Sequence, residues 1–402
     1  MVQGNATLVV DLGNSSTKGK VLFGKDSQTG KYRERTFELS NSFAPIAKDY
    51  VVSNDYSEAT STILHVDAEL NGDPIRGYYC NGELQQREFP RQAIKPSAIE
   101  KKYNLESTIL SYRLAFLFAY KAILNMQRIS DYNQTDITWN VVTLLPPGDL
   151  DKGKALMIDI VKSIESLDCI YPEVKIPIKI DKVAVLPEGY CAYAGVVYDI
   201  GRQFRKGYDD LMHESVLVMD IGAGTTDILM IKDNKLVQNS KYTITQGCNN
   251  VYQIVRRKLR ADNIKIDSDV VQNSVISGKV KDGAKEIDIS ADVNEAKETV
   301  ADVIISEVQD FFDVTGINAR SISHVLICGG GSMVSKSAPD IVALSEKVIK
   351  SFKKLSPNSE LVIIPNHIVT KESEEGEYIK VEEQISPREL NLLGASILAE
   401  LV

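Results

Sequence analysis

The chain has 402 residues, 43% hydrophobic and 25% charged, and a net charge of −9 from 46 Lys and Arg against 55 Asp and Glu. This composition excludes collagen-like, low-complexity and wholly disordered classes, and at about 150 residues per domain the length predicts two or three domains. The acidic balance disfavours non-specific attraction to a nucleic-acid backbone or an anionic membrane.

The N-terminal segment predicts a β-hairpin with a tip of small residues. Apolar strands are expected at 6–10 and 19–23, and Asp11 ends the first of them. The tip consists of Gly13, Asn14, Ser15, Ser16, Thr17 and Lys18. Glycine lets the backbone approach closely, so backbone N–H groups and Ser/Thr hydroxyls can converge on phosphate oxygens, and Lys18 would add a positive charge.

The next part of the chain predicts an α/β domain with an insertion. Residues 25–96 are mostly strand-like and are interrupted by turn signals. Apolar residues at helical spacing predict a helix at 107–129, followed by a buried strand at 139–145 and a helix at 152–167. This alternation is typical of an α/β fold.

Glu188 lies where a strand is expected to pass into a helix rich in small residues, in the segment VAVLPEGYCAYAG at 183–195. Small residues allow helices to pack closely. Glu188 is either an N-terminal charge that the helix dipole favours or a residue that orients a water for attack on a γ-phosphate.

The tip of the first hairpin recurs 209 residues downstream, because VVDLGNSST at 9–17 matches VMDIGAGTT at 218–226. The second tip follows Asp220 and consists of Gly222, Ala223, Gly224, Thr225 and Thr226. One such turn alone is best explained as a plain tight turn, but two copies indicate two like domains that clamp the phosphates of a nucleotide. Since carboxylates repel phosphate, Asp11 and Asp220 are predicted to hold water on a Mg²⁺ ion that the phosphates also bind.

The second half contains two further candidate sites. Gly247 precedes a helix at 251–261, whose basic stretch is either a solvated face or, at Lys258, a contact to a ribose or base edge. An apolar strand at 324–328 runs into Gly329, Gly330, Gly331 and Ser332. The three glycines form either a flexible loop or a surface on which a flat purine or ribose lies against backbone.

The remaining elements are predicted from local patterns. They are short polar strands at 267–289, a helix at 293–314, a helix at 340–353, an exposed hairpin or loop at the acidic run 371–383, and a final helix at 386–401. The last helix is expected to begin at a capping box with Pro387 at its first position.

Cysteine usage and the N-terminus point to a cytoplasmic protein. The five cysteines are scattered, without a C-x-x-C pair, and only four His are present, so a disulfide framework and a structural zinc site are not expected. The N-terminus lacks the pattern of a signal peptide, and no run approaches the roughly 18 apolar residues that span a bilayer. We therefore expect no membrane partner.

Five motifs together resemble the actin-like ATPase superfamily. In chain order, DLGNSSTKGKV, VLPEGYCAYAG, VLVMDIGAGTTDILMI, VLICGGGSMVS and NLLGASILAEL look like phosphate loop one, the first connecting helix, phosphate loop two, the adenosine motif and the second connecting helix. The P-E-G segment, the second loop and the ICGGG strand look most like the bacterial ParM/StbA and Alp group of plasmid-segregating filament proteins. Two departures are the tip residues 14–16, where glycine is frequent, and a long stretch at 196–214.

The resemblance implies a two-lobed, ribonuclease-H-like α/β fold with a nucleotide in the interdomain cleft. Lobe I would be 1–185, with an insertion at about 25–105, together with the C-terminal helix 386–402. Lobe II would be 186–385, with an insertion at about 246–320. The implied cofactors are ATP or ADP and Mg²⁺.

The resemblance also implies roles for the candidate residues. Asp11 and Asp220 would position Mg²⁺, and Glu188 would order the attacking water. The residues expected to hold the nucleotide are Gly13, Asn14, Ser15, Ser16, Thr17 and Lys18 of the first tip, Gly222, Ala223, Gly224, Thr225 and Thr226 of the second tip, and Gly247, Lys258, Gly329, Gly330, Gly331 and Ser332.

The implied function is that of an ATPase that polymerises on binding ATP, depolymerises after hydrolysis and drives plasmid segregation. Its partners would be further copies of itself and a DNA-binding adaptor protein, rather than DNA directly. One alternative is a small-molecule kinase of the same superfamily, which needs a second carboxylate as base, and no residue has a clear claim to that role. Another is a scaffold or cytoskeletal protein of the FtsA, MreB or PilM type.

Overall fold

The computed structural model consists of two compact units. Unit 1 comprises Met1–Leu145, Asp149–Pro187 and Leu398–Val402, and unit 2 comprises Pro146–Gly148 and Glu188–Ile397. The structure describes residues 2–14, 16–25, 32–47, 61–70, 72–96, 101–129, 131–132, 135–171, 173–199, 201–264, 266, 268–283, 285–333, 341–372 and 378–399.

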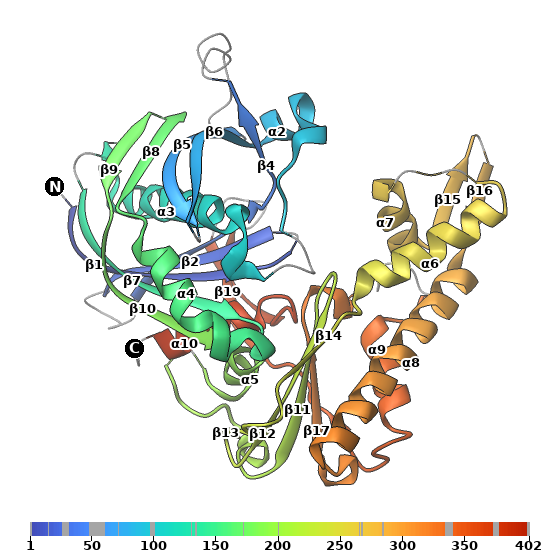
Figure 1. Cartoon of the computed structure of the whole chain (residues 1–402). Helices are drawn as coiled ribbons and strands as arrows, with labels where there is room; N and C mark the ends of the chain where they lie inside the picture. Colours follow the sequence, from blue (N-terminus) through green and yellow to red (C-terminus); the bar gives the residue numbers. More distant parts are fainter. Residues whose placement is uncertain are drawn as a thin grey trace. The chain divides into compact units, whose positions relative to one another are not determined.

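A five-stranded sheet forms the centre of unit 1, in the order β10-β7-β1-β2-β3 (Figure 1). Its strands are β1 (Val2–Leu12), β2 (Ser16–Lys25), β3 (Tyr32–Ser40), β7 (Thr135–Leu145) and β10 (Lys179–Pro187). β1 and β2 form an antiparallel hairpin, whereas β7 and β10 join it as parallel strands. Parallel neighbours need crossover connections, which contain the helices α3 (Glu106–Gln127) and α4 (Leu150–Lys162).

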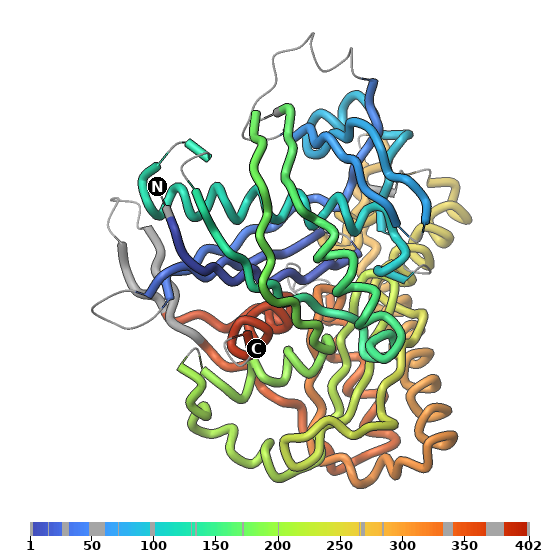
Figure 2. Tube along the Cα trace, turned by 60° about the vertical axis from the view of Figure 1, so that its left-hand side comes forward, coloured from blue at the N-terminus to red at the C-terminus, as the bar shows by residue number. Residues whose placement is uncertain are grey.

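A second sheet of unit 1 has the order β4-β6-β5-β8-β9. It contains β4 (Phe43–Ile46), β5 (Ser61–Leu70), β6 (Asp73–Gly82), β8 (Ser166–Tyr171) and β9 (Val174–Pro177), and the short helices α2 (Glu83–Glu88), η1 (Pro90–Gln92) and η2 (Lys102–Asn104) follow β6. Figure 2 shows the green strands β8 and β9 beside the blue strands β5 and β6, from distant parts of the chain. The strand-like region predicted at 25–96 is therefore completed by β8 and β9. The helix predicted at 152–167 was too long, because α4 ends at Lys162 and Ser166 already begins β8.

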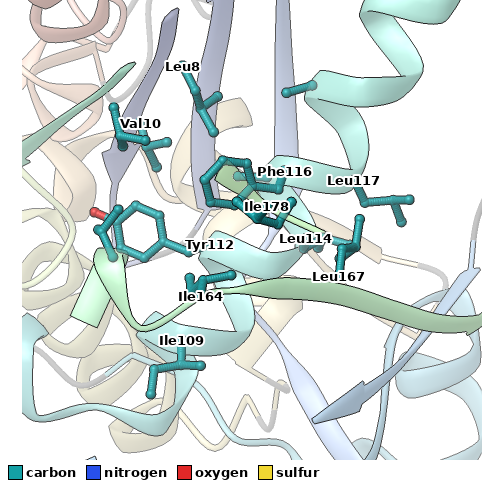
Figure 3. Packing of buried hydrophobic residues seen from close by; sticks show 14 of the residues in the cluster. Leu8, Val10, Ile109, Tyr112, Leu114, Phe116, Leu117, Ile164, Leu167 and Ile178 are labelled. Carbon is teal, nitrogen blue, oxygen red and sulfur yellow. The ribbon is translucent and has the colours of Figure 1, made fainter. Parts of the chain in front are cut away.

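α3 forms the core of unit 1 because it packs against both sheets, on β1, β2 and β3 and on β5 and β8. The buried cluster around it takes side chains from β1, from α3 and from the strands after α4 (Figure 3). Trp139 of β7 is fully buried against the helix, with its ring 5.5 Å from that of Phe116 and its Nε1 donating to the hydroxyl of Tyr120 (3.0 Å).

α3 also meets a simple length and composition test for a membrane-spanning helix, with a mean hydropathy of 1.2 over 18 residues, so our expectation that no run approaches that limit was wrong. Since 83% of that window is buried inside the fold, we interpret α3 as the core helix of unit 1.

The sheet of unit 2 repeats the plan of the central sheet of unit 1. Its order is β13-β12-β11-β17-β18, with β14 paired to β12. The strands are β11 (Ser215–Ile221), β12 (Thr226–Lys232), β13 (Lys235–Leu236), β14 (Tyr242–Ile244), β17 (His324–Cys328) and β18 (Glu360–Leu361). An antiparallel hairpin, β11 and β12, is again followed by two parallel strands, β17 and β18, on the β11 side.

Helices cover both faces of this sheet. The helices are α5 (Tyr190–Val197), α6 (Cys248–Ala261), α7 (Ser268–Ser277), α8 (Ser290–Thr315), α9 (Leu344–Phe352) and α10 (Leu390–Ala399). One buried cluster joins β11 and β12 to α6, α7, α8 and α9, and another joins the opposite face to α5 and α10. The short hairpins are β15 (Lys279–Asp282) with β16 (Lys285–Asp288) and β19 (Asn366–Glu372) with β20 (Tyr378–Gln384), and the 3-10 turns are η4 (Pro147–Asp149), η5 (Asp209–Met212), η6 (Ala319–Ser321) and η7 (Gly330–Met333).

Two predicted elements differ from the structure, and a third has one of the two forms predicted for it. The polar stretch at 267–289 contains the helix α7, whose Val271 and Val275 are buried, before its two short strands. The final helix begins at Leu390 rather than at the capping box, because residues 386–389 form a turn in which Glu389 N donates to Ser386 O (2.9 Å). The acidic run forms the hairpin of β19 and β20, with 373–377 outside the described residues.

The unit boundaries can be set beside the lobes expected from the sequence. Lobe I was expected to end at 185 and to include 386–402, whereas unit 1 runs to Pro187 and unit 2 includes the C-terminal segment as far as Ile397. Leu390 and Leu393 of α10 belong to the same buried cluster as Val218 of β11 and Ala192 of α5.

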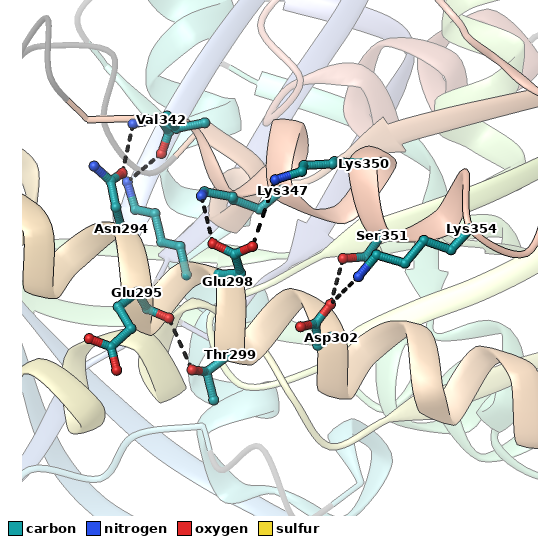
Figure 4. A network of polar contacts seen from close by, with 11 residues as sticks. Asn294, Glu295, Glu298, Thr299, Asp302, Val342, Lys347, Lys350, Ser351 and Lys354 are labelled. Atoms are coloured by element: carbon teal, nitrogen blue, oxygen red, sulfur yellow. Dashed lines mark hydrogen bonds and ion pairs between the residues drawn. The ribbon is translucent and has the colours of Figure 1, made fainter. Parts of the chain in front are cut away.

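A ladder of polar contacts joins α8 to α9 (Figure 4). The pairs are Glu298 with Lys347 (3.0 Å) and Lys350 (3.8 Å), and Asp302 with Ser351 (2.6 Å) and Lys354 (3.5 Å). Beside the ladder, Asn294 accepts from Val342 N (3.0 Å), and the ammonium of Lys297 donates to Val342 O (2.9 Å). Exposed ion pairs each contribute little to stability. Lys297 differs from the residues of the ladder because it is fully buried.

Replacing Lys297 with Met is expected to flatten the pH dependence of stability. Burial, with the nearby charge of Lys347, lowers the pKa of Lys297 from 10.5 to about 8. Between those values the unfolded chain binds more protons than the folded one, so this group adds stability as the pH rises. In urea unfolding at pH 7 to 10, the free energy of unfolding of the wild type should rise with pH relative to that of Lys297→Met. Replacing the exposed Lys350 with Met is the control. A difference in the free energy of unfolding that does not change with pH would contradict the lowered pKa of Lys297.

Candidate phosphate-binding site

The tip of the first hairpin joins β1 to β2 in unit 1. The N–H of Gly13 donates to the carbonyl of Ser16 (3.0 Å) and closes the turn. Asp11 is buried and stands opposite Lys18 in the hairpin register, with 3.9 Å between the ammonium and the carboxylate. Ser15 lies outside the described residues. A carboxylate and an ammonium therefore lie at the base of this turn.

Asn41, which the sequence analysis missed, supports the first tip. Its Nδ2 donates to the carbonyl of Gly13, and its Oδ1 accepts from the hydroxyl of Thr17. Both Asn41 and Thr17 are buried. The hydroxyl of Ser16 in turn donates to Glu38 (2.5 Å). The hydroxyls of Ser16 and Thr17 thus have partners within unit 1.

Replacing Asn41 with Ala is expected to destabilise the tip by about 1–3 kcal/mol, because Gly13 O and the Thr17 hydroxyl would lose a buried partner. Thermal unfolding measures the loss, and nucleotide titration should show weaker binding. The control is Ser42→Ala, since the buried Ser42 hydroxyl has no hydrogen-bond partner among the residues that the structure describes. Equal behaviour of both variants would contradict a supporting role for Asn41.

The second tip joins β11 to β12 in unit 2 and repeats the geometry of the first. The N–H of Gly222 donates to the carbonyl of Thr225 (2.8 Å), as Gly13 does to Ser16. Thr226 is fully buried, as Thr17 is, and its hydroxyl donates to the carbonyl of Gln246 (2.8 Å). The sequence repeat is therefore also a structural repeat.

One position differs between the two tips. Asp220 is buried, and in the register it stands opposite Asp227, where the first tip has Lys18. The carboxylate of Asp227 accepts from the hydroxyl of Thr243 (2.5 Å). The second tip therefore has a second carboxylate in place of the ammonium of the first.

Three glycines pack so closely against the second tip that no side chain would fit. A Cβ at Gly329, whose φ is +85°, would lie 2.2 Å from Asp220 Oδ1. A Cβ at Gly331 would lie 2.5 Å from Gly222 O, and one at Gly247 would lie 2.6 Å from Ala223 O. The predicted glycine segments thus meet at the second tip, and their contacts with protein backbone already require glycine.

The start of α6 fixes the direction of the second tip. The carbonyls of Gly222 and Ala223 accept from the N–H groups of Cys248 (3.1 Å) and Asn249 (2.8 Å). In a trans peptide the N–H points opposite to the carbonyl. The N–H groups that follow these carbonyls, at Ala223 and Gly224, therefore point away from α6 and can receive an anion.

Glu188 lies directly after β10, at the beginning of unit 2. Its side chain is 8% exposed, and its carbonyl accepts from Tyr190 N (2.8 Å). Gly189 has a φ of +72°, and a Cβ there would lie 3.0 Å from Leu229 Cδ2 of β12. A tight turn on the sheet of unit 2 therefore holds Glu188.

Asn391 of α10 connects this turn to the second tip. Its Oδ1 accepts from Gly189 N (2.9 Å), and its Nδ2 donates to Asp220 Oδ2 (2.5 Å). Asn391 lies in the segment expected to be the second connecting helix, but its role could not be predicted, since its partners lie far away in the chain.

The other predicted residues of unit 2 lie in different settings. Lys258 bonds to Asp292 (3.1 Å) and Glu295 (2.6 Å) of α8, and the hydrogen bond to Glu295 raises its pKa, so its charge is paired within unit 2. Ser332 is buried and donates to Gly329 O (2.7 Å). Gly330 lies beside the side chain of Arg388.

The carboxylates present fit Mg²⁺ better than a metal held by protein alone. Asp11 and Asp220 stand at corresponding places, one in each unit, at the ends of β1 and β11. Among the residues that the structure describes, no group of three or more His, Cys, Asp or Glu could hold an ion. Mg²⁺ commonly uses one or two carboxylates, with waters and substrate phosphates as its remaining ligands.

A family model matches the segment that carries the second tip. Residues 218–338, which include part of β11, all of α6 and the glycines after β17, match the model described as archaeal actin homologue MreB-like, C-terminal. No curated protein sequence matches the chain.

Solved actin-like structures superpose on nearly the whole chain. The actin-like protein Alp7A has a TM-score of 0.67 and 15% identity, over 99% of this chain and 97% of its own. A 15-stranded ParM filament from Clostridium botulinum has a TM-score of 0.63 and 17% identity, over 99% of both chains. The archaeal actin homologue Ta0583 in complex with ADP has a TM-score of 0.60 and 13% identity, over 98% of both chains.

Proposed function

Because the chain has the α/β fold of actin-like proteins, we propose that it binds ATP and ADP with Mg²⁺ and hydrolyses ATP to ADP and phosphate. The observation that carries this proposal is the repeated tip, with the hydrogen bonds Gly13 to Ser16 and Gly222 to Thr225 and a buried aspartate before each. Tight turns without a binding role would not need the same hydrogen bond and the same buried aspartate in both units. The ADP complex of Ta0583, a protein with the same fold, supports an adenine nucleotide as the ligand.

The proposed phosphate contacts come mainly from backbone. Because the hydroxyls of Thr17 and Thr226 bond to Asn41 and to Gln246 O, we assign the N–H groups of the two tips to the phosphates. Lys18 and Thr225 supply side-chain contacts, and the glycines at 329–331 receive the adenosine. Glu188 orients the water that attacks the γ-phosphate.

The proposed metal sites are the carboxylates of Asp11 and Asp220, acting through water. When bound, Mg²⁺ would neutralise charge on the phosphate oxygens. The chain's own part is positioning: buried carboxylates at the ends of β1 and β11, and backbone donors in each tip.

We further propose that ATP controls self-association into filaments that segregate plasmid DNA in the cytoplasm. The ParM filament from Clostridium botulinum supports self-association, because a protein of this fold forms a filament there. The net charge of −9 favours a link to DNA through a basic adaptor protein over direct binding. Contacts with the γ-phosphate would favour the state that polymerises, and hydrolysis would release it.

Light scattering recorded together with phosphate release tests the whole proposal. Purified protein is mixed with Mg-ATP, with Mg-ADP or with no nucleotide. Scattering should rise with ATP alone and decay as phosphate accumulates. Filaments that form equally without nucleotide would contradict the coupling. Monomeric ATP binding with phosphate transfer to a sugar or acetate would instead identify a small-molecule kinase.

A further inference from the structure

Asn391 makes two hydrogen bonds that bring the two proposed catalytic elements of unit 2 together. Its carbonyl oxygen accepts from Gly189 N, next to Glu188, and its amide nitrogen donates to Asp220, at the end of β11. The side chain is 8% exposed.

The chemistry of the partners fixes the orientation of this amide. A backbone N–H can only donate and an ionised carboxylate can only accept, so the oxygen of Asn391 must face Gly189 and its nitrogen must face Asp220. An alanine, leucine or serine at this position could not satisfy both groups at these positions. An asparagine satisfies both.

Close backbone contacts between α10 and α5 fix the position of Asn391. One turn later on the same helix, a Cβ at Gly394 would lie 1.6 Å from Cys191 O, so α10 lies directly on the backbone of α5. The carboxylate of Asp220 is confined on its other side by Gly329, where a Cβ would lie 2.2 Å from Oδ1. Small shifts of Asn391 would therefore be transmitted to the carboxylate.

We propose that Asn391 is a positioning residue for ATP hydrolysis, which holds the Asp220 carboxylate and the turn carrying Glu188 in one arrangement. This inference rests on the proposed ATPase function. Asn391 acts through its two partners, because one hydrogen bond fixes the carboxylate at the second tip and the other fixes the backbone beside Glu188. Loss of such a supporting contact typically lowers activity by about 10- to 100-fold.

The variant Asn391→Asp separates positioning from packing, because it has nearly the same shape. Ionised, the new carboxylate still accepts from Gly189 N but repels Asp220. The hydrogen bond from Gly189 N is therefore kept and the one to Asp220 is lost, with little change in side-chain volume.

The experiment measures kcat and KM for Mg-ATP at one pH, and the melting temperature without nucleotide, for the wild type, Asn391→Asp, Asn391→Leu and Ser396→Ala. Ser396 is the control, since it is equally buried on α10 and its hydroxyl bonds to Leu392 O of the same helix (2.6 Å). Each protein is assayed below its melting temperature, so that unfolding does not lower the rate. We expect both Asn391 variants to lose about 10- to 100-fold in kcat, with a smaller change in KM, and Ser396→Ala to keep the wild-type kcat.

The outcomes distinguish this inference from the proposed function. A wild type that does not hydrolyse ATP would overturn the proposed function, and the inference with it. An active wild type with unchanged kcat in the Asn391 variants would overturn the inference alone. An equal loss of kcat in Ser396→Ala would also overturn it, leaving only a packing role. Since Asn391→Asp has nearly the shape of the wild type, the test holds even if Asn391→Leu does not fold.

Discussion

Replacing Glu188 with Gln is expected to lower the rate of ATP hydrolysis by about 100-fold or more while ATP still binds. Glutamine has the size of glutamate and can still form hydrogen bonds, but it cannot accept the proton of the attacking water. Its neighbour Gly189, at a φ of +72°, would keep the turn in place. Because ATP remains intact, assemblies that form on ATP should persist instead of decaying. Phosphate release and light scattering measure the two effects.

A surface glutamate of unit 2 provides the matched control. Glu214 is 43% exposed and pairs with His324 (2.7 Å), so Glu214→Gln removes a carboxylate of the same unit without touching either tip. It should hydrolyse ATP at the wild-type rate. If Glu188→Gln also turned over at that rate, Glu188 would have no part in the chemistry, and the N-terminal charge interpretation would stand.

The sequence was sufficient for the two tips because their information is local. An aspartate at the end of an apolar strand, a glycine two residues later and a second apolar strand specify a hairpin with little help from the rest of the chain. The repeat then predicted two like domains, and each of the two units contains a sheet of the same plan, in the orders β10-β7-β1-β2-β3 and β18-β17-β11-β12-β13. The actin-like fold class, which rested on the same motifs, is likewise confirmed.

The supports of the tips could not be predicted, because they join residues that are distant in the chain. Asn41 lies 28 residues from Gly13, and Asn391 lies 171 residues from Asp220. Neither forms part of a recognisable local pattern. Periodicity predicted the helix at 107–129, which α3 confirms, but not its surroundings. Because α3 packs against two sheets and is apolar nearly all round, it passes a test designed for membrane helices.

Local signals also failed where tertiary contacts take precedence. Ser386 to Glu389 has the spacing of a capping box, yet the helix begins only at Leu390, which is fully buried. Gly329 N donates to Pro387 O (3.1 Å), so this segment is held as a turn beside the glycine loop. A helix starting at 386 would lose that contact.

Replacing Gly394 with Ala is expected to destabilise the protein by about 3 kcal/mol or more, since overpacking that no side chain can relieve costs at least the upper part of the usual range. A Cβ there would lie 1.6 Å from Cys191 O and 2.8 Å from Gly195 N, and both atoms are backbone. Gly195 in turn faces Leu390 O, 2.9 Å from its own Cβ position. The crossing of α5 and α10 therefore has room for glycine only, and the melting temperature should fall by roughly 10 °C.

The same substitution is expected to lower ATP hydrolysis in the fraction that remains folded. Separating α10 from α5 moves Asn391, one turn before Gly394, away from Gly189 and Asp220. The control is Gly201→Ala, where the nearest atom to a Cβ is a side-chain oxygen of Asp199 at 3.3 Å rather than backbone, and its stability should stay within about 0.5 kcal/mol of the wild type. If Gly394→Ala had the same melting temperature as Gly201→Ala, α5 and α10 could separate at little cost. The contact of these helices would then not fix the position of Asn391, on which its proposed role depends.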